Sequence, residues 1–164
     1  KIMKFRVNDA STDSFVLPGT LSAIAMIPEI SATNTRLFNI GAHSHHAGHS
    51  GGGMHKINNK VFDRDRVDET VSAGTTEIWT FDNTTGHEPH PMHIHGVMFQ
   101  ILDRTGGRGV LIASETGWKD TVMVMPFEKV RVIMTFPNNP GKFVFHCHNL
   151  EHADDGMMLQ YQSS

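Results

Sequence analysis

The apolar residues of this chain recur in short runs with turn residues between them, and this spacing strongly limits the folds available. The runs are rich in Val, Ile, Thr and Phe, which favour strands. No stretch shows convincing helical periodicity, although a single turn could form at Asn149–Asp155. The predicted strands are Thr35–Ile40, Glu69–Val71, Thr76–Phe81, His93–Leu102, Thr121–Met125, Lys129–Phe136 and Lys142–His148. Strands at this spacing predict an all-β fold, an antiparallel β-sandwich.

Composition excludes several classes of function. The 164 residues suffice for one globular domain with a sizeable core. With 14 basic and 17 acidic residues and a net charge of −3, the chain lacks the basic footprint of a nucleic-acid-binding protein. No apolar stretch approaches the roughly 18 residues of a membrane-spanning helix. A single cysteine excludes an intrachain disulfide framework, whereas 12 His and 10 Met favour a metal site.

The first 33 residues differ from the rest of the chain. Residues 1–7 alternate as a strand does, with no initiator or signal segment before them. Residues 8–33 contain Pro18, Gly19 and Pro28 and show no clear period, so we expect an extended linker. The main domain is therefore predicted at 34–164, and the sequence is expected to be part of a longer polypeptide.

Two short segments contain most of the candidate metal ligands. Residues 90–96 read HPMHIHG, and residues 146–157 read HCHNLEHADDGM. Side chains two apart on an extended strand share a face, and neighbours oppose each other. One layer of ligands should therefore comprise His93, His95, His146 and His148. The opposite layer should comprise His90 and Cys147, with His152 and Met157 able to fold back from the following loop.

The two layers suit different metal chemistry. Two imidazoles, one thiolate and a weak axial thioether form a blue-copper electron-transfer site. A structural zinc site would not need the distant methionine and usually shows paired cysteines. Four imidazoles without a thiolate suit copper that binds and reduces an oxygen species. Several more imidazoles would be needed to complete a multinuclear site.

These two segments resemble the C-terminal copper motifs of the multicopper oxidases, especially bacterial laccases, copper-efflux oxidases and spore-coat laccases. Shorter matching stretches extend the resemblance over almost the whole chain: KINNK at 56–60, TEIW at 76–79, GWKD at 117–120 and GMM at 156–158. The resemblance implies a cupredoxin-like Greek-key β-sandwich at 34–164, the third domain of such an oxidase. Residues 1–7 would be the last strand of the preceding cupredoxin domain.

The resemblance also implies a role for each candidate ligand. Type 1 copper would be bound by His90, Cys147, His152 and, weakly, Met157. The type 2 copper would take His93, and the type 3 pair would take His95, His146 and His148. Electrons would pass from Cys147 to His146 and His148, and the complete enzyme would contain four copper ions.

The expected partners also follow from the resemblance. They are the N-terminal cupredoxin domains, which supply the other trinuclear ligands, together with dioxygen and a small reducing substrate. That substrate could be a phenol, a bilirubin-like pigment or a cuprous or ferrous ion. The chain lacks the Met-rich insertion of copper-efflux members, which favours organic donors. The compartment stays open, although the family is mostly periplasmic, secreted or spore-associated.

Two other functions fit the sequence less well. A one-copper electron-transfer protein would use His90, Cys147, His152 and Met157 but would leave the four other histidines without a purpose. A structural cupredoxin that has lost copper is inconsistent with a ligand at every family position.

Three further features leave alternatives open. The Gly- and His-rich loop at 41–55 is either a solvated insertion or a copper-capture segment. Glu88 is either a surface carboxylate or a group that steers the electron donor. Relatives often carry an acid where this chain has Ala153, so the proton route would use Asp154, Glu151, water or another domain.

Overall fold

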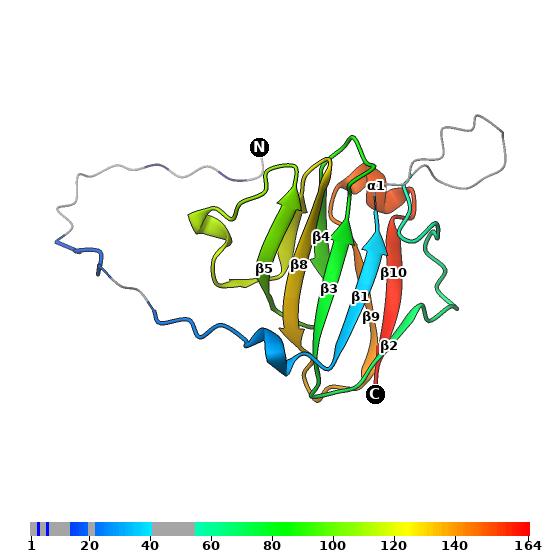
Figure 1. Ribbon diagram of the computed structural model, residues 1–164, viewed down its shortest axis with the longest axis horizontal. Helices are drawn as coiled ribbons and strands as arrows, with labels where there is room; N and C mark the ends of the chain where they lie inside the picture. The colour runs from blue at the N-terminus through cyan, green and yellow to red at the C-terminus, as the bar shows by residue number, and fades with distance from the viewer. Residues whose placement is uncertain (1–2, 4–5, 7–13, 20–21, 41–54) are drawn as a thin grey trace.

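Two five-stranded sheets pack into a sandwich in the computed structural model, which describes residues 3, 6, 14–19, 22–40 and 55–164 (Figure 1). One sheet has the order β1 (Asn34–Asn39), β3 (Thr76–Asp82), β8 (Glu128–Thr135), β5 (Phe99–Gly106) and β6 (Trp118–Lys119). The other has the order β2 (Glu69–Val71), β10 (Met158–Ser163), β9 (Gly141–Cys147), β4 (His90–Ile94) and β7 (Thr121–Val124). The all-β prediction is confirmed.

The helices of the described ranges are short. They are the 3-10 turns η1 (Glu29–Ser31) and η2 (Ala113–Glu115) and the helix α1 (Leu150–Asp154). None of the helices in these ranges is long and apolar enough to span a bilayer. The helical turn expected at Asn149–Asp155 is therefore present as α1, with Asn149 as its N-cap.

The sequence predicts an antiparallel sandwich, but the strand pairing is mixed. β1 pairs with β3 in parallel, and β10 pairs with β2 in parallel. Between β1 and β3 the chain passes through β2 of the opposite sheet, and between β2 and β10 it passes through strands of both sheets, so these pairs arise from crossovers and not from hairpins. The other strand pairs are antiparallel, including β4 with β9 and β4 with β7.

The single strand predicted at His93–Leu102 is wrong. The segment divides into β4 of one sheet and β5 of the other, with a corner around Gly96. Gly96 adopts a left-handed φ of 78°, and a Cβ there would lie 2.7 Å from the ring of Phe143. Only glycine fits this corner without strain, because it has no Cβ. The strands β6 and β10 were not predicted.

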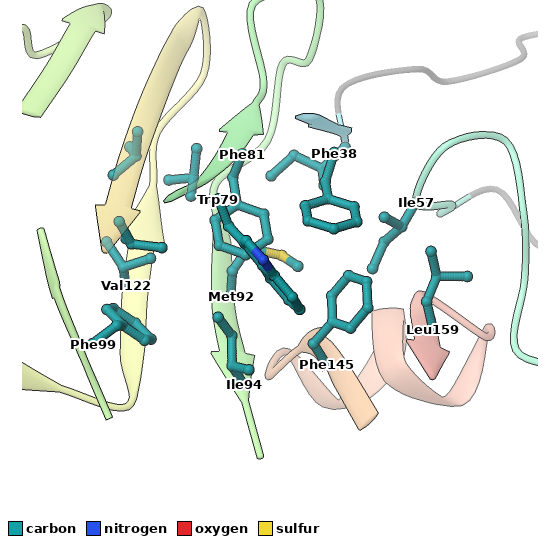
Figure 2. Packing of buried hydrophobic residues seen from close by; sticks show 14 of the residues in the cluster. Phe38, Ile57, Trp79, Phe81, Met92, Ile94, Phe99, Val122, Phe145 and Leu159 are labelled. Atoms are coloured by element: carbon teal, nitrogen blue, oxygen red, sulfur yellow. The ribbon is translucent and has the colours of Figure 1, made fainter. Parts of the chain in front are cut away.

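Aromatic packing between the sheets forms the centre of the core. Phe38 of β1 lies 4.9 Å from Trp79 of β3 and 4.7 Å from Phe145 of β9, measured between ring centroids. Met92 and Ile94 of β4 lie in the same cluster (Figure 2). Their burial fixes which face of β4 and β9 points inward, because side chains alternate along a strand.

The described part of the predicted linker contacts β5. The backbone N–H of Ile27 donates to Oε1 of Gln100 at 2.7 Å, and Nε2 of Gln100 donates to the carbonyl of Ala25 at 2.9 Å. Within residues 1–7 only Met3 and Arg6 are described. The boundaries at 7/8 and 33/34 stay predictions.

We expect Gly96→Ala to lower the free energy of unfolding by about 1–3 kcal/mol, the range for a non-glycine residue held in a left-handed conformation. The clash with Phe143 adds to this cost. Chemical denaturation should measure the difference. Gly19→Ala is the control, because a Cβ at Gly19 meets nothing within 4 Å. Equal stability of the two variants would contradict the account of this corner.

Candidate metal centre

The candidate ligands lie on two neighbouring strands and on the loop that follows one of them. β4 and β9 are antiparallel, with Met92 opposite Cys147 and His93 opposite His146. Along β4, His90, Met92 and Ile94 are buried, whereas His93 is only partly buried. Cys147 is likewise buried, and its neighbour His146 is partly exposed. Strand alternation thus sends the ligands to opposite faces of this sheet.

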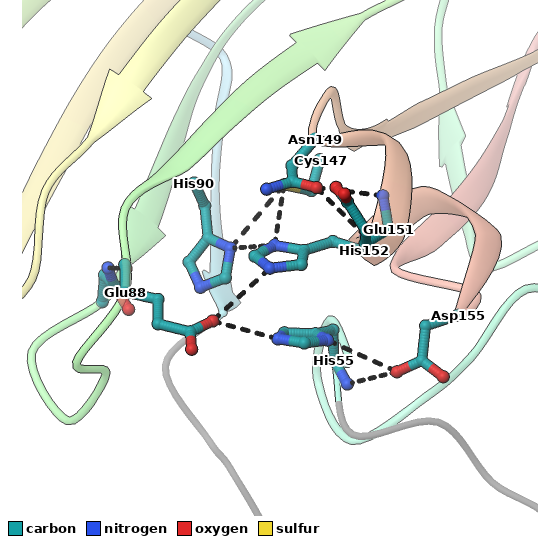
Figure 3. Close-up of polar contacts among 9 residues, drawn as sticks. His55, Glu88, His90, Cys147, Asn149, Glu151, His152 and Asp155 are labelled. Atoms are coloured by element: carbon teal, nitrogen blue, oxygen red, sulfur yellow. Dashed lines mark hydrogen bonds and ion pairs between the residues drawn. The ribbon is translucent and has the colours of Figure 1, made fainter.

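The inward face brings together His90, Cys147 and His152 (Figure 3). The Nδ1 atoms of the two histidines lie 3.2 Å apart. Sγ of Cys147 lies 3.6 Å from Nδ1 of His90 and 3.5 Å from Nδ1 of His152. A point equidistant from three atoms so spaced is about 2 Å from each, close to the bond lengths of a first-row metal to imidazole and thiolate. These three side chains, called the buried trio below, therefore fit a small soft or borderline cation.

Local backbone bonds bring His152 back to the strand. Asn149 caps α1, its side-chain oxygen accepting from the backbone N–H groups of Glu151 and His152. The N–H of Cys147 donates to the carbonyl of Met157 at 3.1 Å, and the N–H of Met157 donates to that of His152 at 2.9 Å. Met157 is fully buried beside them. These backbone hydrogen bonds thus hold the loop in place without a metal.

The outward face carries a second cluster, made of His93, His95, His146 and His148. Nitrogens of the first three lie within 4.8 Å of one another, and the Nε2 atoms of His95 and His146 are 3.2 Å apart. The ring of His148 lies 5.6 Å from that of His93 and 5.5 Å from that of His146. This cluster has room for metal ions among imidazoles but contains no thiolate or carboxylate ligand.

Hydrogen bonds to carbonyls fix two of these imidazoles. Nδ1 of His93 donates to the carbonyl of Asp120 at 2.7 Å, and Nδ1 of His146 donates to the carbonyl of Cys147 at 2.9 Å. Each bond sets the tautomer of its ring and leaves Nε2 as the nitrogen available to a metal.

Burial shifts the pKa of two imidazoles in the outward cluster and of the buried thiol. Burial lowers the pKa of His95 and His146, and the positive charge of neighbouring imidazoles lowers it further. Neutral imidazole is the form that binds metals. Burial also raises the pKa of Cys147 to about 11. Without a metal this residue is a thiol and a poor nucleophile, whereas a coordinating cation would deprotonate it. Thiol-based catalysis is therefore disfavoured.

Two residues that sequence reasoning did not assign to the site, His55 and Glu88, contact the ring of His152, and a third, Asp155, holds His55. The ring of His55 stacks on that of His152, with centroids 3.7 Å apart and planes 16° apart. Oε2 of Glu88 lies 3.1 Å from Nε2 of His55 and 3.4 Å from Nε2 of His152. Oδ2 of Asp155 accepts from the backbone N–H of His55 at 3.0 Å. Only the position of Glu88, two residues before His90, offered a signal.

The role of the Gly- and His-rich loop and the proton route near Ala153 both stay open. Of the Gly- and His-rich loop, residues 41–54 lie outside the described part, and only His55 can be placed. Asp154 is exposed and Ala153 is partly buried. The next acid in the chain, Asp155, contacts His55.

Comparison with known proteins identifies the fold and family. The family model described as multicopper oxidase matches residues 29–164. The chain belongs to the multicopper oxidase family. Like other members it has a cupredoxin-like sandwich, so that prediction is confirmed. Membership in a multicopper oxidase family also implies copper as the metal.

Relatives of this multicopper oxidase chain include a laccase of Haloferax volcanii, 36% identical over 166 residues that cover 98% of this chain and 28% of the laccase. The crystal structure of laccase from Pediococcus acidilactici matches with a TM-score of 0.74 and 33% identity, covering 94% of this chain and 32% of that one. A Campylobacter jejuni multicopper oxidase, described as a metallo-oxidase, matches with a TM-score of 0.78 and 29% identity, covering 92% and 34%.

The chain thus spans about a third or less of the length of these proteins. The full-length relatives contain other domains, which this multicopper oxidase sequence does not cover.

Added copper(II) or cobalt(II) should give the wild-type protein a thiolate-to-metal charge-transfer absorption. Cys147→Ser should abolish this band, because serine offers no thiolate. His93→Ala is the control and should keep the band, because His93 lies in the outward cluster. Visible absorption spectra would measure both variants, and a band that survives in Cys147→Ser would contradict the assignment of the buried trio.

Proposed function

We propose that this chain is the C-terminal part of a laccase-like multicopper oxidase. Single electrons from a reducing substrate would enter at a type 1 site and leave through a trinuclear site. When bound, copper supplies the one-electron chemistry of donor oxidation and of the reduction of dioxygen to water. The protein supplies the ligands, the electron path and the exclusion of water.

The type 1 site would be formed by His90, Cys147, His152 and Met157. Two imidazole nitrogens and a thiol lie within 3.2–3.6 Å of one another, and all three side chains are buried. Two imidazoles and a thiolate with a weak thioether are the donors that blue-copper centres use. Burial keeps water from completing the coordination, and the closed loop from 148 to 157 holds the geometry. These contacts support electron transfer rather than substrate binding at the metal.

The outward cluster would supply this chain's share of the trinuclear site. We assign His93 to the type 2 copper and His95, His146 and His148 to the type 3 pair. The hydrogen bonds at Nδ1 of His93 and His146 support this assignment, because they direct Nε2 toward the same cluster. Four imidazoles are too few for three copper ions. The remaining ligands would come from the N-terminal cupredoxin domains of the same oxidase.

The position of Cys147 is the observation that carries the proposal. Its side chain belongs to the buried trio, and both of its sequence neighbours belong to the outward cluster. An electron leaving Sγ would reach His146 or His148 through a few covalent bonds. The hydrogen bond from Nδ1 of His146 to the carbonyl of Cys147 provides a second, shorter connection.

Electrons would enter at the edge of His152. His90 is fully buried, whereas His152 is 7% exposed and lies under the partly exposed Glu88. The relatives' names include laccases, a bilirubin oxidase and a metallo-oxidase, so an organic pigment and a metal ion are both proposed as donor classes for this entry point. A one-copper electron-transfer protein is the weaker alternative, because the outward imidazoles would then have no function.

The proposal can be tested by following the thiolate-copper absorption of the full-length, copper-loaded protein. A one-electron donor added without oxygen should bleach the band, and admitting oxygen should restore it within seconds. His95→Ala should still bleach, because its buried trio is intact. Its recovery should be slower by at least about 10-fold, because even the loss of a residue that only supports a metal ligand typically costs about 10- to 100-fold.

Lys142→Ala is the matched control, since Lys142 is exposed on the same strand as His146. It should bleach and recover at the wild-type rates. If His95→Ala also recovered at the wild-type rate, the outward cluster would have no part in oxygen reduction, and the proposal would fail.

A further inference from the structure

The outer edge of His152 is enclosed by two side chains from distant parts of the sequence (Figure 3). His55 covers one face of the ring at a centroid distance of 3.7 Å. The carboxylate of Glu88 lies across the outer edge, 3.4 Å from Nε2. That edge is opposite Nδ1, the atom that faces Cys147 and His90. His55 and Glu88 therefore contact the same imidazole ring whose Nδ1 faces the other two residues of the buried trio.

Each enclosing residue is held by bonds of its own. Nε2 of His55 donates to Glu88 at 3.1 Å, and the backbone N–H of His55 donates to Asp155 at 3.0 Å. The loop that carries Glu88 is tied to the fully buried Asn83, whose Nδ2 donates to the Glu88 carbonyl at 2.8 Å. The arrangement is thus preformed, with the His55 side chain only 11% exposed and the backbone of Glu88 fixed by Asn83.

We propose that His55 and Glu88 are positioning residues for His152, together forming a clamp that directs its Nδ1 toward the metal. Nε2 of His152 lies 3.4 Å from the Glu88 carboxylate, and an ionised carboxylate can only accept a proton donor, so this contact favours the tautomer with its proton on Nε2 and its lone pair on Nδ1. The stack with His55 restricts rotation of the ring about its χ2 angle. The inference rests on the proposed type 1 site and names two residues outside its ligand set.

The clamp has two consequences for a bound copper. A carboxylate behind a ligating imidazole makes that ligand more basic and fixes its orientation. Its negative charge also favours the more highly charged cupric state, which lowers the reduction potential. Loss of Glu88 should therefore weaken metal binding and raise the potential. Loss of His55 should weaken binding through disorder of the ring, with a smaller change in potential.

Cobalt(II) affinity of the full-length protein, followed by its thiolate charge-transfer band, measures the positioning without any turnover. Glu88→Ala and His55→Ala should each bind cobalt about 10- to 100-fold more weakly, the usual effect of removing a residue that supports a metal ligand. His55→Phe keeps a stacked ring and should recover most of the affinity. Glu88→Gln keeps an acceptor for the proton of Nε2 but loses the charge.

Redox titration of the copper-loaded protein separates the effect of the Glu88 charge from that of its polar contact with Nε2 of His152. Glu88→Gln and Glu88→Ala should both raise the potential of the blue band. Only the alanine variant should also scatter the orientation of His152, seen as a broadened copper paramagnetic resonance spectrum. Glu151→Gln is the control, because it removes the same charge from an exposed residue next to His152 in α1. It should leave affinity, potential and spectrum unchanged.

Two different failures can be distinguished. If the wild-type protein shows no thiolate charge-transfer band, the proposed type 1 site is wrong. If the wild type shows the band but the Glu88 and His55 variants match Glu151→Gln in affinity and potential, the clamp alone is wrong. The conservative variants Glu88→Gln and His55→Phe keep the test valid if an alanine variant fails to fold.

Discussion

The alternation of side chains along β9 is the constraint on which the rest of the site depends. Phe145 and Cys147 point into the core, so His146 must point outward. The inward position of Phe145 is fixed in turn by its contacts with Phe38 and Trp79, at 4.7 and 5.0 Å between ring centroids. Core packing thus decides which face Cys147 occupies. A slip of one residue in register would exchange the two ligand sets.

Side chains alternate in the same way along β4, which pairs with β9. Met92 lies opposite Cys147 in the register and is buried with it, which leaves His93 beside His146 on the other face. Two strands with a period of two therefore generate two clusters of different chemistry on opposite sides of one sheet. The inner side is buried and contains the only thiol of the chain, whereas the outer side is more exposed and contributes only imidazoles. This division matches the proposed separation of electron entry from oxygen reduction.

Much of this organisation could be predicted from sequence because it is local. Most strand positions and the short helix α1 follow from apolar spacing and from the cap at Asn149. The corner at Gly96 was missed because a continuous run of apolar residues follows it, and periodicity does not show a change of sheet. β10 was missed because it buries polar residues: Nε2 of Gln160 donates to the carbonyls of Asp63 and Arg66, which no local pattern reveals.

Contacts between segments that are distant in sequence are the second kind of feature that could not be predicted. His55 and His152 are separated by most of the domain sequence, and the residues next to His55 in the sequence do not predict that its ring stacks on that of His152. Glu88 illustrates the same point. Its side chain is 53% exposed, as a turn carboxylate should be, and yet its oxygen faces two imidazoles. The sequence left Glu88 as either a surface carboxylate or a group that steers the electron donor. The structure shows an exposed carboxylate, and steering of the donor stays a prediction.

Anomalous diffraction at the copper edge from crystals of the full-length, copper-loaded protein tests the central claim most directly. The account predicts one peak enclosed by Nδ1 of His90, Nδ1 of His152 and Sγ of Cys147. It predicts further, separate peaks beside the Nε2 atoms of the outward histidines. A buried trio without copper density, or a single peak in the whole domain, would contradict the account.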